Sequence, residues 1–362
     1  MFGSILIFLL VLSILVVVHE LGHFLVAKKN GIWVEEFGFG LPPRVFGKKI
    51  GETLYSVNLL PFGGFVKLHG ELNDNDVVDK SRAFINKSKK VKTAVIIAGV
   101  IMNFLLGIVA FAIVYSFSGI PRETGEVKIL EISTNSPAQD ARLLVGDVIK
   151  KVDKEEVKSV SEFVSKVENK KGKKVILELQ DRKVTITPRS NPPEGEGPLG
   201  VIISSSEIYF PPVWQRPFYG IYYGFKEAVF WGKNVVLGFG NIFKDLFQGR
   251  APKDISGPVG VFAVTSETAK AGILPLINLL GIISINLAIL NILPFPALDG
   301  GRLLFIFIER IVGRKVIPKV ETIIHSIGMI ILLALILAIT IHDIQGLISA
   351  GSISAFLNNM IK

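Results

Sequence analysis

Four long apolar stretches constrain this chain more than any other feature of its sequence. Residues 93–119, 271–298 and 322–342 contain no Asp, Glu, Lys or Arg, and residues 1–27 contain only Glu20. A helix rises about 1.5 Å per residue, so each stretch is long enough to cross about 30 Å of hydrocarbon. The stretches predict a polytopic α-helical membrane protein with four transmembrane helices, and they exclude a purely soluble, fibrous or disordered chain.

The composition limits the classes of site that the chain can form. The chain has 362 residues, a formal charge of +9 and no cysteine. That length allows two or three domains. Without a thiol, disulfide scaffolds, cysteine-ligated zinc sites and thiol nucleophiles are excluded. The first apolar stretch is followed, not preceded, by its basic residues Lys28 and Lys29, which favours a membrane helix over a cleaved signal peptide.

The distribution of basic residues predicts the orientation. Residues 28–92 contain 12 Lys and Arg, whereas Lys362 is the only basic residue after the fourth stretch. The loop after the third stretch is also basic, with Arg302, Arg310, Arg314, Lys315 and Lys319. By the positive-inside rule both basic loops face the cytoplasm, so both termini and residues 120–270 lie outside.

The predicted organisation follows the apolar stretches. Between and after the four membrane helices come a cytoplasmic segment, an external domain, an amphipathic segment, a cytoplasmic loop and an external tail, at residues 28–92, 121–203, 204–270, 299–321 and 343–362. In the amphipathic segment, apolar residues recur at helical spacing between charges, which predicts an interfacial helix; they are Phe218, Tyr222, Phe225 and Val229. A helix packed on a soluble domain is an equal alternative.

The first membrane helix carries a reactive motif, His19-Glu20-Leu21-Gly22-His23. Histidines four residues apart lie on one face of a helix, so both imidazoles can reach one ion while Glu20 leans toward the same site. About 0.004 such motifs are expected by chance from these residue frequencies. At membrane depth such groups cost several kcal/mol unless ligated or paired. The motif therefore predicts a metal site; the alternative is a polar patch bonded to a neighbouring helix.

A third ligand is needed, because a catalytic zinc ion takes three ligands from protein and leaves a fourth position for water. With cysteine absent, it must be a carboxylate or another histidine, and Asp299 is the best candidate. Two prolines before it and two glycines after it should break the helix and present it inward. The alternative is that Asp299 caps the next helix with Arg302 as its partner. His69, His325 and His342 are weaker ligand candidates.

The chemistry that suits such a site is amide hydrolysis. Zinc lowers the pKa of a bound water toward neutrality and polarises the scissile carbonyl. Glu20 would take the proton of that water and return it to the leaving nitrogen. Asn291, beside the expected helix break, could donate its side-chain amide to the oxyanion, or it could instead join two helices.

Together these motifs resemble a known family. His19-Glu20-x-x-His23 in a first membrane helix, with Leu298-Asp299-Gly300-Gly301 closing a later one, is similar to the site-2 proteases, and most to the bacterial regulator-of-sigma-E type. Further matches are Phe37-Gly38-Phe39-Gly40, Pro61-Phe62-Gly63-Gly64-Phe65-Val66, Ser256-Gly257-Pro258-Val259-Gly260 and Asn291-x-x-Pro294. The resemblance implies a zinc endopeptidase that cuts membrane-spanning substrates. It implies Glu20 as general base, Asn291 as a substrate or oxyanion contact, and as Zn²⁺ ligands His19, His23 and Asp299.

The cytoplasmic segment offers a way to hold a helical substrate extended. Thr53–Leu59 and Phe65–Leu68 are predicted strands joined by a Pro-Phe-Gly-Gly hairpin signature. An open strand edge near the site would accept an unwound substrate by strand addition. The resemblance implies a membrane-associated β-sheet with a re-entrant loop, whose substrate-contacting candidates are Gly38, Gly40, Gly63 and Gly64. A plain cytoplasmic hairpin without a substrate role is the alternative.

The external domain alternates apolar and polar residues, as in Val175–Leu179, which predicts strands. Ser136-Pro137-Ala138 is expected to begin a short helix, and Ser161–Val167 to lie in a second. This α+β pattern resembles a bacterial, permuted PDZ domain, with one departure: Arg142 stands where the family usually has glycine. Such a domain would bind a peptide terminus or exclude substrates whose external part is untrimmed; we favour the size filter.

The resemblance also implies partners and a location. Substrates would be single-span membrane proteins such as anti-sigma factors or remnant signal peptides, cut in the bacterial inner membrane toward the cytoplasmic leaflet. The lipid bilayer is the other expected partner, and no nucleic acid is expected. Two other functions stay open: a metal or proton transporter that uses the intramembrane His, Glu and Asp, and a non-proteolytic PDZ scaffold.

Overall fold

The structure is a computed structural model, and it describes residues 2–71, 77–193, 195–250, 257–313 and 318–361. Predictions made from Ser256, Arg314, Lys315 and Lys362 lie outside these residues. The chain forms two compact units. The membrane unit consists of the chain before Gly119 and after Val213, and the second unit consists of Gly119–Val213.

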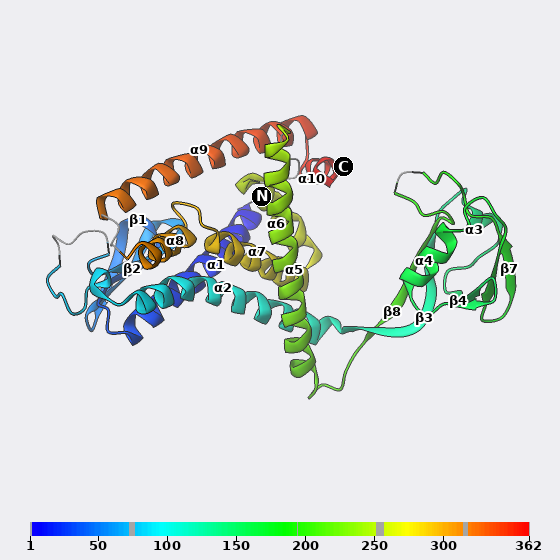
Figure 1. Ribbon diagram of the computed structural model, residues 1–362, viewed down its shortest axis with the longest axis horizontal. Helices are drawn as coiled ribbons and strands as arrows, with labels where there is room; N and C mark the ends of the chain where they lie inside the picture. Colours follow the sequence, from blue (N-terminus) through cyan, green and yellow to red (C-terminus); the bar gives the residue numbers. More distant parts are fainter. Residues whose placement is uncertain (1, 72–76, 194, 251–256, 314–317, 362) are drawn as a thin grey trace. The chain divides into compact units, whose positions relative to one another are not determined.

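The membrane unit combines apolar helices with one sheet (Figure 1). Its elements are α1 (Phe2–Lys29), β1 (Val34–Ile50), β2 (Thr53–Leu68), the 3-10 turn η2 (Phe84–Asn86), α2 (Lys89–Ser118), α5 (Arg216–Phe247), α6 (Pro258–Ala271), α7 (Ile273–Ile292), α8 (Asp299–Val312), α9 (Pro318–Ala350) and α10 (Ile353–Ile361). Within the described ranges, α1, α2, α7 and α9 are the helices long and apolar enough to cross a membrane. The four apolar helices predicted from the sequence are therefore confirmed.

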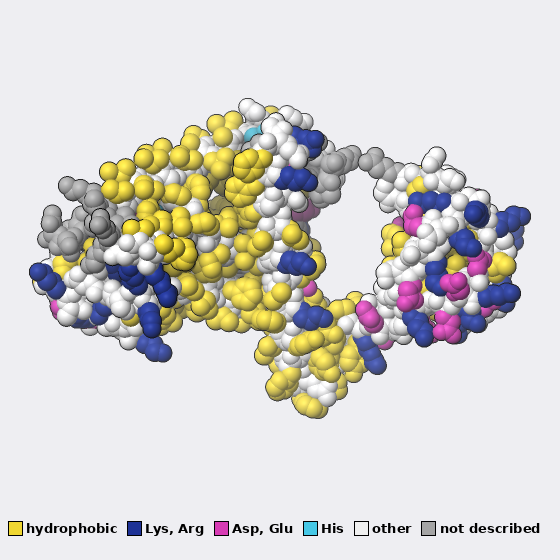
Figure 2. Space-filling model, viewed as in Figure 1, with side chains coloured by type: hydrophobic (Ala, Val, Ile, Leu, Met, Phe, Trp, Pro, Cys, Tyr) yellow, Lys and Arg dark blue, Asp and Glu magenta, His cyan; other side chains and the backbone are white. Residues whose placement is uncertain are grey.

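These helices expose much of their apolar surface. In α9, Ile330, Leu333 and Leu337 are 67%, 58% and 61% exposed. Figure 2 shows apolar side chains covering most of the visible face of this unit, whereas Lys, Arg, Asp and Glu are spread over the second unit. Continuous exposed apolar surface on this scale fits lipid rather than water.

Several helix boundaries differ from the predicted ones. α7 ends at Ile292 rather than at residue 298, because two prolines follow and cannot continue the helix. The predicted loop 299–321 contains α8, and the predicted tail 343–362 contains the end of α9 and the whole of α10. Counting charges missed α8 because it is amphipathic, with exposed apolar residues at helical spacing, namely Leu304, Phe307, Ile308 and Ile311.

The helix predicted within 204–270 is present as α5, and it packs on α2 and α7 around the fully buried Phe111 and Ala228. Gly220 and Gly224 make this contact possible, because a Cβ at either position would stand 2.6 to 2.7 Å from backbone atoms of α2. Figure 1 shows α5 crossing α2 steeply. Since α5 packs on apolar membrane helices, the alternative of a helix on a soluble domain is wrong.

The sheet of the membrane unit is more intertwined than the predicted hairpin. Residues 34–39 of β1 pair with residues 64–68 of β2 on one side and with residues 54–57 on the other. The second half of β1 continues beyond a register shift and pairs with residues 53–58. A direct hairpin between the two predicted strands is therefore wrong, because the first half of β1 lies between them.

The placement of this central strand has a packing reason. Val34, at its start, is fully buried in a cluster with Ala27 and Ile32 from the end of α1 and the turn after it. Gly38 and Gly40 consequently lie within β1, so a strand stands at these residues where a loop is predicted. The re-entrant position of this segment stays a prediction.

The second unit is a sheet with two short helices. Its elements are β3 (Ile120–Ile132), α3 (Pro137–Asp140), β4 (Val148–Val152), β5 (Glu155–Glu156), α4 (Val160–Glu168), β6 (Val175–Leu179), β7 (Lys183–Ile186) and β8 (Val201–Tyr209). The strand order is β7-β6-β4-β3-β8, with β5 beside β4. Ser136 and Ser159 cap α3 and α4 by accepting a backbone N–H three residues on, as the helix predictions require.

Arg142 stands where the PDZ-like sequence pattern has a glycine, and its backbone conformation is one that favours glycine. Its φ is 55°, in the left-handed region that glycine enters at little cost and other residues rarely adopt. Its carbonyl oxygen accepts a hydrogen bond from Arg182 at 3.1 Å, which helps to hold the turn. At this position an arginine therefore adopts a backbone conformation that favours glycine.

Candidate metal centre

The two histidines of the motif are placed by the packing of α1. Val11, Leu15 and His19 are four residues apart on its buried stripe, and none is more than 9% exposed. Gly22 lets α1 press against α2, because any Cβ there would overlap the Ala98 carbonyl. His23 follows one turn after His19 on the same face, so both imidazoles point away from lipid into the helix packing.

Asp299 is placed by the turn that follows α7. The segment 293–298 doubles back on the start of α8 so closely that a Cβ at Gly300 or Gly301 would overlap the carbonyl oxygens of Leu293 and Phe295. The N-cap of α8 is Leu298 and has no side-chain cap. The alternative in which Asp299 caps α8 with Arg302 as its partner is therefore wrong. Asp299 is free to point at α1.

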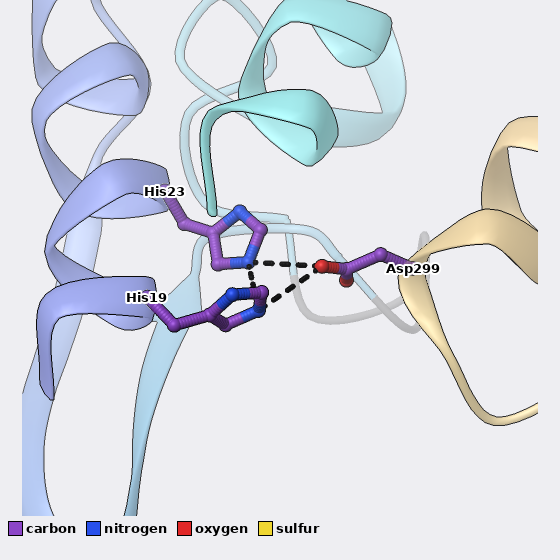
Figure 3. A group of neighbouring side chains, drawn as sticks. All are labelled: His19, His23 and Asp299. Atoms are coloured by element: carbon purple, nitrogen blue, oxygen red, sulfur yellow. Dashed lines mark hydrogen bonds and ion pairs between the residues drawn. The ribbon is translucent and has the colours of Figure 1, made fainter. Parts of the chain in front are cut away.

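The three predicted ligands converge (Figure 3). The Oδ2 atom of Asp299 lies 3.1 Å from His19 Nε2 and 3.3 Å from His23 Nε2, and the two Nε2 atoms are 3.1 Å apart. Zinc–nitrogen and zinc–oxygen bonds of about 2.0 to 2.2 Å at tetrahedral angles would place ligand atoms about 3.3 Å apart. The triangle of donor atoms therefore has the size that a tetrahedral zinc ion requires.

The protonation pattern of the site also points to a cation. His23 Nδ1 lies 2.8 Å from the Val95 carbonyl oxygen, so Nδ1 donates and the Nε2 of the neutral ring carries a lone pair. Asp299 Oδ2 is buried and accepts no hydrogen bond from any described residue. Electron pairs aimed at one another in a low-dielectric interior repel unless a cation lies between them.

The site opens into a cavity of about 790 Å³. Glu20 lines this cavity together with the three ligands. The Cγ atom of Glu20 would lie 3.6 Å from a Cβ at Gly64, so the edge of β2 runs beside the motif. Residues 65, 66 and 68 of β2 line the same cavity. An extended peptide in the cavity would therefore meet both the glutamate and a strand edge.

The remaining candidates stand apart from this cluster. Asn291 lies in the last turn of α7 and is not among the described residues that line the cavity, and neither are Gly38, Gly40 and Gly63. Gly64 is the one glycine of the four whose surroundings include a motif residue.

The three other histidines have separate partners or surroundings. His69 is 1% exposed, and its Nδ1 lies 2.8 Å from Glu35 Oε1. His325 Nδ1 accepts the N–H of Ala297 at 3.0 Å and lines the far side of the cavity. The side chain of His342 is 84% exposed. None of the three joins the ligand cluster.

Two features of the site are not predicted from the sequence. Arg302 pairs with Glu71, which is 231 residues away in the chain, and both line the cavity. Gly99 of α2 lies directly against both ligand histidines. Nothing in a single sequence shows which helix packs behind the motif, because that contact has no local periodicity.

Two imidazoles and a carboxylate around one point, with a glutamate beside them in a cavity, define a metal-dependent hydrolase. The chain belongs to peptidase family M50, the site-2 proteases, whose family model matches residues 7–335. The protein is therefore a peptidase, and the resemblance to site-2 proteases is confirmed.

The relatives are similar over nearly their whole length. The chain is 37% identical to a Clostridium acetobutylicum protein named provisionally as a zinc metalloprotease, over 95% of this chain and 98% of the relative. It is 31% identical to zinc metalloprotease RasP of Geobacillus kaustophilus, over 94% and 98%. It is 29% identical to regulator of sigma-W protease RasP of Bacillus subtilis, over 95% and 99%.

Proposed function

We propose that this protein is a zinc-dependent intramembrane endopeptidase that cuts single-span membrane proteins within or near their transmembrane segments. The observation that supports it most is the convergence of three electron-pair donors beside Glu20: two come from α1, which is apolar enough to span a bilayer, and the third, Asp299, comes from the start of α8. His19, His23 and Asp299 hold the ion in this proposal. Zinc suits two imidazoles and one carboxylate, and the Geobacillus kaustophilus relative is named a zinc metalloprotease.

Each group at the site has a separate role in hydrolysis. The ion supplies a water of lowered pKa and polarises the scissile carbonyl. Glu20 accepts a proton from the attacking water and delivers it to the leaving nitrogen, for which its place on the cavity wall beside the ligands is suited. Asn291 donates its side-chain amide to the substrate or to the oxyanion in this scheme.

The substrate is held as an added strand. A membrane helix has all its amides paired, so the backbone needs new partners when it unwinds. Residues 64–68 form the outer edge of the sheet, pair on their inner side with β1, and line the cavity at Phe65, Val66 and Leu68. A peptide that pairs with this edge passes beside Glu20.

The relatives support the substrates and the location that we propose. The Bacillus subtilis protein is named a regulator of sigma-W protease, which supports anti-sigma factors as substrates here, with remnant signal peptides as the second group. The protein then lies in the bacterial inner membrane with both termini outside, and its site lies toward the cytoplasmic leaflet, as the basic loops indicate.

The second unit acts in this proposal as a PDZ-type size filter outside the membrane. Its sheet, its two short capped helices and its core around Val127, Phe163 and Leu177 support a PDZ-like domain. The filter excludes substrates that keep a large external domain.

The test of catalysis uses purified protein, a single-span substrate and three variants. Glu20→Gln should keep wild-type zinc content and lose cleavage, because it removes the base and keeps the ligands. Asp299→Ala should lose both zinc and cleavage. Asn291→Ala should keep zinc and cleave more slowly. Full cleavage by Glu20→Gln would remove the glutamate from its role, and full zinc content in Asp299→Ala would place the third ligand elsewhere.

A further inference from the structure

α2 forms the wall behind both ligand histidines. Val95, Gly99 and Asn103 are four residues apart and so lie on one face of this helix. The Val95 carbonyl oxygen binds His23 Nδ1 at 2.8 Å. A Cβ at Gly99 would stand 2.5 Å from His23 Nε2 and 2.7 Å from His19 Cε1. One turn further, the side-chain amide of Asn103 meets the ring of His19.

The contact between Asn103 and His19 leaves one polar atom of Asn103 without a hydrogen-bond partner among the described residues. Asn103 Nδ2 lies 3.5 Å from His19 Nδ1, while Asn103 Oδ1 is buried and has no hydrogen-bond partner among the described residues. Asn103 is only 1% exposed, so bulk solvent does not reach this oxygen. A buried unpaired carbonyl oxygen costs about 1 to 3 kcal/mol.

Rotating the side-chain amide of Asn103 by 180° gives its oxygen a hydrogen-bond donor. The oxygen and nitrogen of an asparagine amide are placed by inference from hydrogen bonds. In the turned form Oδ1 takes the position of Nδ2 and accepts a hydrogen bond from His19 Nδ1–H. His19 must carry its proton on Nδ1 if Nε2 is to offer its lone pair to the metal.

We propose that Asn103 is a positioning residue of the metal centre: its Oδ1 accepts the Nδ1–H of His19, which fixes the tautomer and the ring plane of this ligand. The inference rests on the proposed ligand set. The Val95 carbonyl does the same for His23, so α2 supplies one acceptor for each histidine. Acceptors of this kind on ligand histidines typically contribute 10- to 100-fold to metal affinity.

The helix holds Asn103 firmly enough for this task. Ser284 of α7 donates its hydroxyl to the Asn103 carbonyl oxygen at 2.7 Å, and both residues are buried. This bond fixes the backbone of α2 at the level of His19. Asn103 therefore acts on the metal through His19 and need not touch the substrate.

The experiment compares three variants of the full-length protein. Asn103→Leu keeps the volume and removes the acceptor, and Asn103→Asp keeps an acceptor oxygen. Asn286→Leu is the matched control, because Asn286 lies in α7, also has a buried unpartnered Oδ1, and does not line the cavity. Zinc affinity is measured by competition with a chromophoric chelator, and ligand geometry by the visible absorption of the Co²⁺-substituted protein.

Asn103→Leu should bind zinc about 10- to 100-fold more weakly and change the Co²⁺ spectrum, while Asn103→Asp should stay within a few-fold of the wild type. Asn286→Leu should leave both readouts unchanged. Wild-type zinc affinity in Asn103→Leu, or no rescue by a folded Asn103→Asp, overturns the proposal. If Asn103→Leu does not fold, the ¹⁵N resonances of His19 in the zinc-bound wild type decide: the proposal requires the proton on Nδ1, and a proton on Nε2 overturns it.

A further variant separates this inference from the ligand assignment. His19→Ala should lose zinc if His19 is a ligand. Wild-type zinc affinity in His19→Ala would mean that the ligand set itself is wrong. Loss of zinc in His19→Ala together with wild-type affinity in Asn103→Leu would mean that the ligand set stands and only the role of Asn103 fails.

Discussion

Gly99 gives the sharpest test of how tightly the metal centre is packed. In Gly99→Ala the new Cβ would stand 2.5 Å from His23 Nε2, where ordinary contact begins at 3.4 Å, so the ring or the helix must move by about 0.9 Å. Metal sites tolerate about 0.2 Å of error in ligand distance. A displacement of about 1 Å in a catalytic arrangement costs about 100-fold in rate. We expect Gly99→Ala to lose zinc at chelator concentrations that the wild type withstands, and to lose at least about 100-fold in kcat/KM.

The matched control for this prediction is Gly107→Ala in the same helix. A Cβ there would also stand 2.5 Å from a side-chain atom, but that atom belongs to Ile285, which does not line the cavity of the metal site. Zinc content is measured by elemental analysis after gel filtration, and cleavage with a single-span substrate. Gly107→Ala should keep its zinc. If Gly99→Ala keeps wild-type zinc and activity, α2 does not confine the ligands and the reasoning fails.

Three further predictions concern the scaffold. Asp343 of α9 is 2% exposed and accepts hydrogen bonds from the N–H groups of Gly257 and Gly260 at 2.9 Å each. Asp343→Ala should therefore lower the free energy of unfolding by about 2 to 4 kcal/mol. An unchanged melting temperature would contradict this prediction. Hydrogen bonds from Arg82 and Lys28 lower the pKa of Glu52 from 4.5 to about 2. The stability that Glu52 adds is therefore present above pH 4.5 and lost as the pH falls toward 2. The melting temperatures of wild type and Glu52→Gln should differ at about pH 7 and converge in acid. A difference in melting temperature that grows in acid would contradict this pH dependence. Deleting residues 121–200 should allow cleavage of substrates with long external domains, and the filter fails if only trimmed substrates are cut.

The metal site was predictable because its signals are local. His19 and His23 are separated by one helical turn, and the prolines and glycines around Asp299 are contiguous in the sequence. The cap alternative for Asp299 could be dismissed only from the structure, because the choice depends on where segment 293–298 turns. Local chemistry thus predicted the candidate ligands, and tertiary contacts bring their donor atoms together.

The parts that sequence reasoning missed are those made by distant segments. The first half of β1 lies between two parts of β2, an order that the alternation of side chains does not encode. A count of charges predicts a loop where α8 lies, because the charged residues of α8 interrupt an apolar stripe of helical period. Asn103 was visible as a polar residue in an apolar helix, but only the packing of α2 on α1 assigns it a neighbour.

The ligands are held from two sides by different helices, and this gives the ion a structural consequence. His19 and His23 are positioned by α2, through Val95 and the space at Gly99. Asp299 follows a turn held by α9, where His325 accepts the Ala297 N–H and Gly328 fits against Pro296. Ala297 has a φ of 80°, a conformation that costs free energy and that this bond helps to maintain. In the proposed site, an ion held by His19, His23 and Asp299 would add a link between α1 and the α8–α9 side, because α9 is hardly buried elsewhere. Such an ion would then join the halves of the cavity as well as activate water within it.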